Sequence, residues 1–142
     1  MATASTASVP RWFTAVALLA VIWNAFGVVM YLSSVGVFGD PMAGLSEPER
    51  AAASSIPSWI TGAFAIGTLA GLIGSLGLLL RKAWAQPVLL ASMVALLVLE
   101  GWIMFFSGAL AVFGLAVPIT VSAGAILLLW LATHARGQNW IS

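Results

Sequence analysis

The sequence predicts an all-α, polytopic membrane protein with four transmembrane helices packed as an up-down bundle, in a single domain over residues 1–142. Hydrophobic residues make up 62% of the chain and charged residues 6%, and the mean hydropathy is +1.11. A soluble domain carries about 25% charged residues, so this chain has too few charges to cover a surface in water. Lipid offers the backbone no hydrogen-bond partners, and continuous Leu, Ala and Val runs favour helices over a closed barrel.

Uncharged stretches of the chain place the four helices. The first two stretches each supply one span of the length that a bilayer requires. The third, 83–133, is interrupted only by Glu100 and is long enough for two helices, so we expect it to turn near 107–113. Pro118 either begins the last helix or kinks it one turn in. The predicted spans cover about 12–38, 57–80, 84–106 and 114–134.

The basic residues predict how the helices are oriented. If the helices alternate in direction, four of the five basic residues fall on one side of the membrane and only Arg50 on the other. Because basic residues concentrate on the cytoplasmic side, we expect both termini in the cytoplasm and the loop 39–56 outside. In that loop, Ser46 and Glu49 have the spacing of a capping box, which predicts a short helix. The four residues on the cytoplasmic side are Arg11, Arg81, Lys82 and Arg136.

Composition excludes several classes of function. The chain has no cysteine and one histidine, so it has no disulfide, no thiol chemistry and no metal-ligand set. It contains no nucleophile–base constellation and no phosphate-binding loop, so we expect neither an enzyme nor a bound cofactor. A net charge of +1 without a basic cluster makes nucleic acid an unfavourable partner. The expected surroundings are a lipid bilayer and other membrane proteins.

Glu100 is the one ionisable residue predicted to lie inside the hydrocarbon. An ionised carboxylate there is costly, so we expect its side chain to face the bundle and to be protonated. Polar residues of the first two helices fall at compatible depths and form the rest of a candidate intramembrane polar site. Packing and interhelical hydrogen bonding are the alternative role for these residues. The site consists of Glu100, Asn24, Tyr31, Thr61 and Thr68.

Small residues on the second span predict close contact between helices. Ala63, Gly67, Gly71 and Ser75 recur every four residues, and Gly74 widens the same face. Such a face lets a neighbouring backbone approach along most of the span. We therefore expect this face to pack against other helices.

Four short motifs resemble those of a group of small, uncharacterised bacterial four-helix membrane proteins. They are Pro10-Arg11-Trp12-Phe13, Trp23-Asn24, Ala63-Phe64-Ala65-Ile66, and Ala83-Trp84-Ala85 followed by Pro87. Some members of that group carry an automatic sugar-transporter label. The resemblance implies a bacterial inner-membrane location, but its motifs are anchors and packing residues and imply no functional residues.

Two functions fit these features. The first is a structural or accessory subunit that binds other membrane components, and this is the function we expect. The alternative is a small transporter or permeation protein in which Glu100 is a protonatable site, acting as a homodimer because four helices rarely enclose a wide path.

Overall fold

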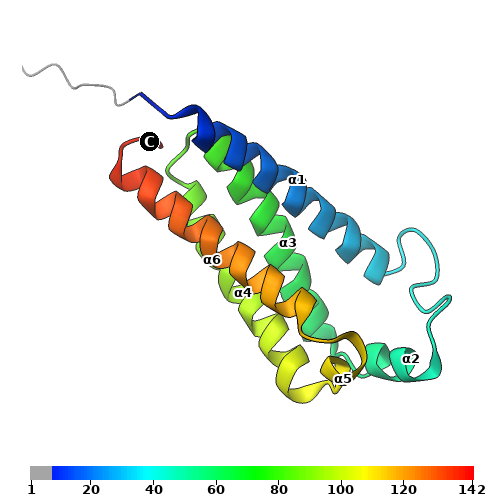
Figure 1. Cartoon of the computed structure of the whole chain (residues 1–142). Coiled ribbons are helices and arrows are strands. Elements are labelled where there is room, and N and C mark those ends of the chain that lie inside the picture. Colours follow the sequence, from blue (N-terminus) through cyan, green and yellow to red (C-terminus); the bar gives the residue numbers. More distant parts are fainter. Residues whose placement is uncertain (1–7) are drawn as a thin grey trace, which may run out of the picture.

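The structure is a computed structural model that describes residues 8–142, and within that range it is entirely helical, with no strand. Four of its helices are long and apolar enough to cross a membrane, which confirms the predicted class. These four lie alongside one another, and the two short helices lie together at one end (Figure 1). The elements are α1 (Arg11–Ser34), α2 (Glu47–Ser54), α3 (Ser58–Leu79), α4 (Ala85–Phe106), α5 (Ala109–Phe113) and α6 (Ala116–Gly137).

Three of the long helices end in the same capping motif. After α1, Gly36 adopts a left-handed conformation, and the Val37 amide donates to the Leu32 carbonyl at 3.0 Å. Arg81 after α3 and Asn139 after α6 have the same role, with φ of 59° and 56°. This Schellman arrangement satisfies carbonyl groups that a helix end otherwise leaves without partners. It also ends α1 at Ser34, four residues before the predicted end of the span.

The turn between α4 and α6 resolves the ambiguity over Pro118. Gly108 and Gly114 have φ of 66° and 76°, and they bracket the short helix α5. Helix α6 then begins at Ala116, so Pro118 is its third residue. Proline in a first turn breaks no helical hydrogen bond because the amide there has no partner. Pro118 therefore begins the helix and does not kink it.

Helix α3 lies between α1 and α4, and α6 packs mainly against α4. The glycines of α3 allow its neighbours to approach closely. An added Cβ atom at Gly67 would lie 2.6 Å from the Leu96 side chain, and one at Gly74 would lie equally close to Leu89. At Gly71 the same atom would overlap Asn24 Oδ1 of α1 and lie 3.0 Å from Ser92 Oγ of α4. Gly71 is thus the point where three helices meet.

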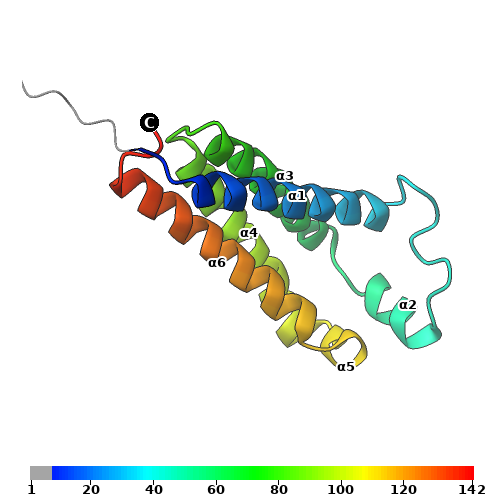
Figure 2. The ribbon, with the colours of Figure 1, turned by 45° about the horizontal axis from the view of Figure 1, so that its top comes forward.

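The two ends of the bundle are packed differently. At the end that carries the first residues of α1, Phe13 and Ala17 share a buried cluster with Leu131 and Ala135 of α6. The last residues close that end, because Ser142 exchanges backbone hydrogen bonds with Arg81 and Ala83. Toward α2 and α5, α1 and α6 move apart (Figure 2). A second buried cluster there joins α3, α4 and α6 and includes no residue of α1.

Helix α2 begins at the capping box that the sequence predicts. The backbone amide and the hydroxyl of Ser46 both donate to Glu49 Oε2, at 2.8 and 2.6 Å. These hydrogen bonds lower the pKa of Glu49 below its ordinary value, the hydroxyl contributing most. The cap is therefore complete at neutral pH and is lost as the pH falls through that lowered pKa.

Gly71→Ala should destabilise the protein, because the new methyl group would overlap Asn24 Oδ1. We expect a loss of about 1 to 3 kcal/mol of unfolding free energy, measured by thermal or denaturant unfolding in detergent. Gly62→Ala is the matched control, since an added Cβ on that residue of the same helix meets nothing within 4 Å. Equal stability of the two variants would show that α3 does not pack as described.

Candidate functional site

Five polar side chains are buried in the described part of the bundle, and they come from three helices. Each is at most 7% exposed, and four of them make hydrogen bonds within the protein. A buried polar group in lipid has no water to bind, so its partners decide whether it has a structural or a chemical role. The five are Asn24 on α1, Thr68 and Ser75 on α3, and Ser92 and Glu100 on α4.

Asn24 joins α1 to α3. Its Nδ2 atom donates to the Ala20 carbonyl at 2.8 Å and to Ser75 Oγ at 3.0 Å. Ser75 Oγ in turn donates to the Gly71 carbonyl at 2.7 Å. The helical spacing of Phe13, Ala17, Ala20 and Asn24, all buried, turns this amide toward α3. Both N–H groups of the Asn24 side chain thus have acceptors, one on its own helix and one on α3.

Ser92 joins α4 to α3, one turn of α3 from the Gly71 carbonyl that Ser75 binds. Its hydroxyl donates to the Gly67 carbonyl at 2.6 Å. Sequence reasoning missed this serine. The signal was present, since Leu89, Ser92 and Leu96 are spaced as one helix face and all three are buried.

A small cavity lies beside these hydrogen bonds. Its volume is about 20 Å³, and its walls include Trp23 and Asn24 of α1, Ser92 of α4 and Gly124 of α6. A cavity needs about 10 to 15 Å³ to hold a water molecule, so this one has room for a single water. It has no room for a solute such as a sugar.

The remaining residues of the predicted polar site lie toward the α2 end. Thr68 Oγ1 donates to the Phe64 carbonyl of its own helix at 2.9 Å, and its methyl group packs toward Gly27 of α1. Tyr31 is half-buried, and its ring meets the edge of the Phe64 ring with centroids 5.6 Å apart. Thr61 is half-buried as well. These contacts are those of helix packing.

Glu100 is buried but stands outside the hydrogen-bond network. It is 5% exposed, and within residues 8–142 its carboxyl group makes no hydrogen bond. The amide of Asn24 and the hydroxyl of Thr68 already donate elsewhere, so they do not converge on Glu100 as the sequence led us to expect. Hydroxyl groups in a helix reach their own backbone carbonyl at the lowest cost in conformational freedom, which explains the difference for Thr68.

The predicted packing face divides between the interior and the surface. Four of its residues, Gly67, Gly71, Gly74 and Ser75, are buried against α1 and α4. Ala63 is half-buried and lines a shallow groove on the outside of the bundle, with a volume of about 540 Å³. The groove is apolar and runs between α3 and α4. Its lining is Trp59, Gly62, Ala63 and Ile66 from α3 with Ala91, Val94, Ala95 and Val98 from α4.

No protein-family model, curated protein or solved structure matches this chain. The resemblance noted from the sequence motifs therefore stays a prediction.

Asn24→Ala should destabilise the bundle more than Glu100→Leu. The first removes an interhelical hydrogen bond and leaves a void, for an expected loss of about 1 to 2 kcal/mol. The second replaces a buried carboxyl group that has no hydrogen bond in the described chain with an apolar group of similar size, so we expect unchanged or higher stability. Unfolding in the same detergent measures both. A large loss for Glu100→Leu would mean that the carboxyl group has a partner that the bundle requires.

Proposed function

We propose that this chain is a structural or accessory subunit of a bacterial inner-membrane assembly and that it binds another membrane protein through the groove between α3 and α4. The groove is the observation that supports this function. It is apolar, it lies on the outer face of the bundle, and an added Cβ at Gly62 meets nothing within 4 Å. Small residues along such a groove allow a helix backbone to approach closely, which drives association in lipid.

The interior of the bundle supports the same proposal. Glycines bring α1, α3 and α4 into direct contact, and the cavity beside Asn24 has a volume of only about 20 Å³. A chain with this interior is suited to presenting a surface and not to enclosing a solute. Neither catalysis nor a cofactor forms part of the proposal.

The proposed topology is an up-down bundle with both termini in the cytoplasm. In its support, residues from the start of α1, the end of α3, the start of α4 and the end of α6 share one buried cluster. Arg11, Arg81, Lys82 and Arg136 flank these same helix ends, and the segment 40–49 with its three acidic residues follows the other end of α1. This distribution is the one that the positive-inside rule favours.

A second candidate function is proton-coupled transport through Glu100. The observation in its favour is that Glu100 is 5% exposed within a helix long enough to span the membrane, and no basic residue lies on any of the central turns. Intramembrane acids of this kind often belong to proton relays. This candidate requires proton flux into vesicles that contain the purified chain.

The accessory function is tested by photocrosslinking in the native membrane. A photoreactive phenylalanine analogue at Ala95, in the groove, should give adducts with another protein chain. Ala123, an exposed alanine on α6 outside the groove, is the matched control and should give none. The mass of the adduct distinguishes a second copy of this chain from a different subunit.

Equal protein adducts at both positions, or none at Ala95, would contradict the proposed docking face. Proton flux that Glu100→Gln abolishes without unfolding the protein would favour transport instead.

A further inference from the structure

Four of the five basic residues of this chain gather at one end of the bundle. Arg11 begins α1, Arg81 and Lys82 form the turn between α3 and α4, and Arg136 lies in the last turn of α6. All four side chains are exposed. The four acidic residues lie elsewhere in the chain, three of them in 40–49 and Glu100 on α4. This end therefore presents a positive surface without a carboxylate side chain to neutralise it.

Arg136 is held in place by a chain of hydrogen bonds between two helices. Its Nη1 atom donates to Gln86 Oε1 of α4 at 2.7 Å, and Gln86 Nε2 donates to Thr133 Oγ1 of α6 at 3.2 Å. Thr133 Oγ1 donates to the Leu129 carbonyl at 2.9 Å. A guanidinium group carries five N–H donors, so most of them stay free to bind an anion. A guanidinium oriented by one hydrogen bond still has paired N–H donors for bidentate contact with phosphate.

The turn that carries Arg81 and Lys82 is fixed close to this arginine. The Ser142 amide donates to the Arg81 carbonyl at 3.0 Å, and the Ala83 amide donates to the Ser142 carbonyl at 3.1 Å. Gln86, the partner of Arg136, lies four residues after Lys82. Its backbone amide donates to the Ala83 carbonyl at 3.2 Å. Backbone hydrogen bonds thus hold the turn with Arg81 and Lys82 against Ser142, and Gln86 links the first turn of α4 to Arg136 of α6.

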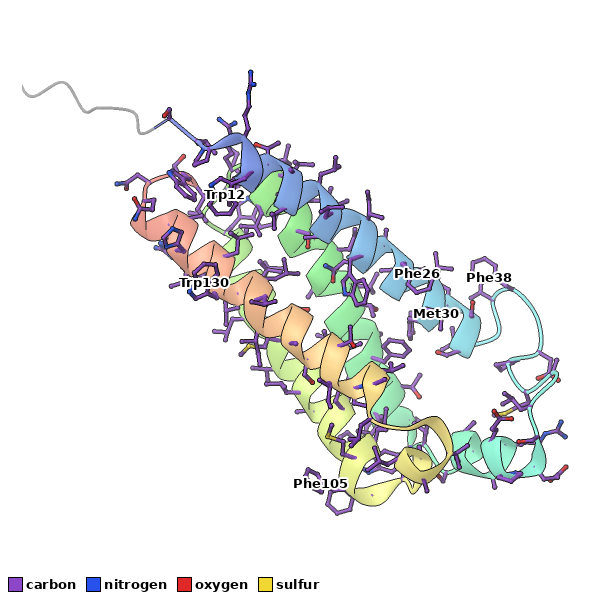
Figure 3. All side chains as sticks on the ribbon, in the orientation of Figure 1. Trp12, Phe26, Met30, Phe38, Phe105 and Trp130 are labelled. Carbon is purple, nitrogen blue, oxygen red and sulfur yellow. The ribbon has the colours of Figure 1, made fainter. Side chains whose placement is uncertain are left out.

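Tryptophan side chains lie around this region, near the ends of the long helices. Trp12 and Trp140 pack in a T-shaped, edge-to-face contact with centroids 5.6 Å apart, and His134 stacks on Trp130 at 5.4 Å. Trp12 and Trp130 lie on the side of the bundle near the chain ends, and both are about half exposed (Figure 3). Tryptophan rings prefer the headgroup level of a bilayer. The basic side chains therefore lie at the depth of lipid phosphates.

We infer that this end of the bundle binds the headgroup of an anionic phospholipid, with Arg136 as the main phosphate contact and Arg81 and Lys82 supplying further positive charge. Gln86 is a positioning residue that orients the guanidinium. Charge complementarity selects the anionic lipid over a zwitterionic one, because both carry a phosphate but only the first has a net charge. The inference does not depend on the accessory function, since it concerns a different surface from the α3–α4 groove.

The test is lipid retention by the purified full-length chain, measured by native mass spectrometry after incubation with phosphatidylglycerol or phosphatidylcholine. We expect selective retention of phosphatidylglycerol. Removing one cation, as in Arg136→Gln, should lower that preference about five-fold, and Gln86→Leu should lower it by disordering Arg136. Arg50→Gln is the matched control, because Arg50 lies near the opposite end of α3 and donates to the Met42 and Leu45 carbonyls.

Two further measurements make each outcome decisive. Thermal unfolding in phosphatidylcholine shows whether each variant is folded, and Arg81→Gln provides a second variant that leaves the α4–α6 hydrogen bonds intact. Inorganic phosphate is the competitor that separates a lipid site from a site for a free anion. Equal retention of both lipids, an equal effect of Arg50→Gln, or complete displacement of the lipid by inorganic phosphate would overturn the inference.

Discussion

Close contact between backbones at α3 is the constraint on which the rest of this structure depends. Lipid is as apolar as leucine, so a membrane helix gains little by burying apolar side chains against another helix. Association relies on packing and on hydrogen bonds, and both require short distances between helix axes. Gly67, Gly71 and Gly74 supply those distances because their missing side chains leave room for Leu96, Asn24 and Leu89. A single helix thereby positions α1 on one side and α4 on the other.

The same glycines supply acceptors as well as space. Ser75 and Ser92 donate to the carbonyl groups of Gly71 and Gly67, so two hydroxyl groups from two helices end on the backbone of α3. A carbonyl oxygen has two lone pairs and can accept a second hydrogen bond beside its helical one. Asn24 of α1, Ser92 of α4 and the small residues of α3 therefore act together to hold the three helices in contact. Glu100 takes no part in these hydrogen bonds, which makes that residue the natural place to look for a role other than packing.

Sequence reasoning reaches the four apolar helices and the capping box of α2 because each depends on local chemistry. Charge gaps mark the helices, and the Ser46–Glu49 pair satisfies its own helix end. The predicted end of α3 is correct to within one residue, but α6 continues to Gly137, beyond the predicted end at 134. Asn139 takes the left-handed conformation after α6 that glycine usually occupies, so the sequence gives a weaker signal for that helix end. Hydrogen-bond partners were harder to predict. Position along a helix predicts which residues lie at the same depth in the bundle. It does not predict the rotation of each helix about its axis or the competition from backbone carbonyls, and these decide that Asn24 binds Ser75 and that Ser92 binds Gly67.

The two ends of the bundle differ in how firmly the long helices are held together. At the end with the first residues of α1 and the last residues of α6, a buried cluster, the aromatic contacts of Trp140 and the hydrogen bonds of Ser142 fix all four long helices together. At the other end, α1 separates from α6, and the buried cluster is made by α3, α4 and α6 without it. The fixed end can hold a headgroup contact without rearrangement, because Arg136 is already oriented by Gln86. If the proposed headgroup contact forms, it would keep the α3–α4 groove at one depth in the bilayer, where the proposed partner helix would meet it in a constant register.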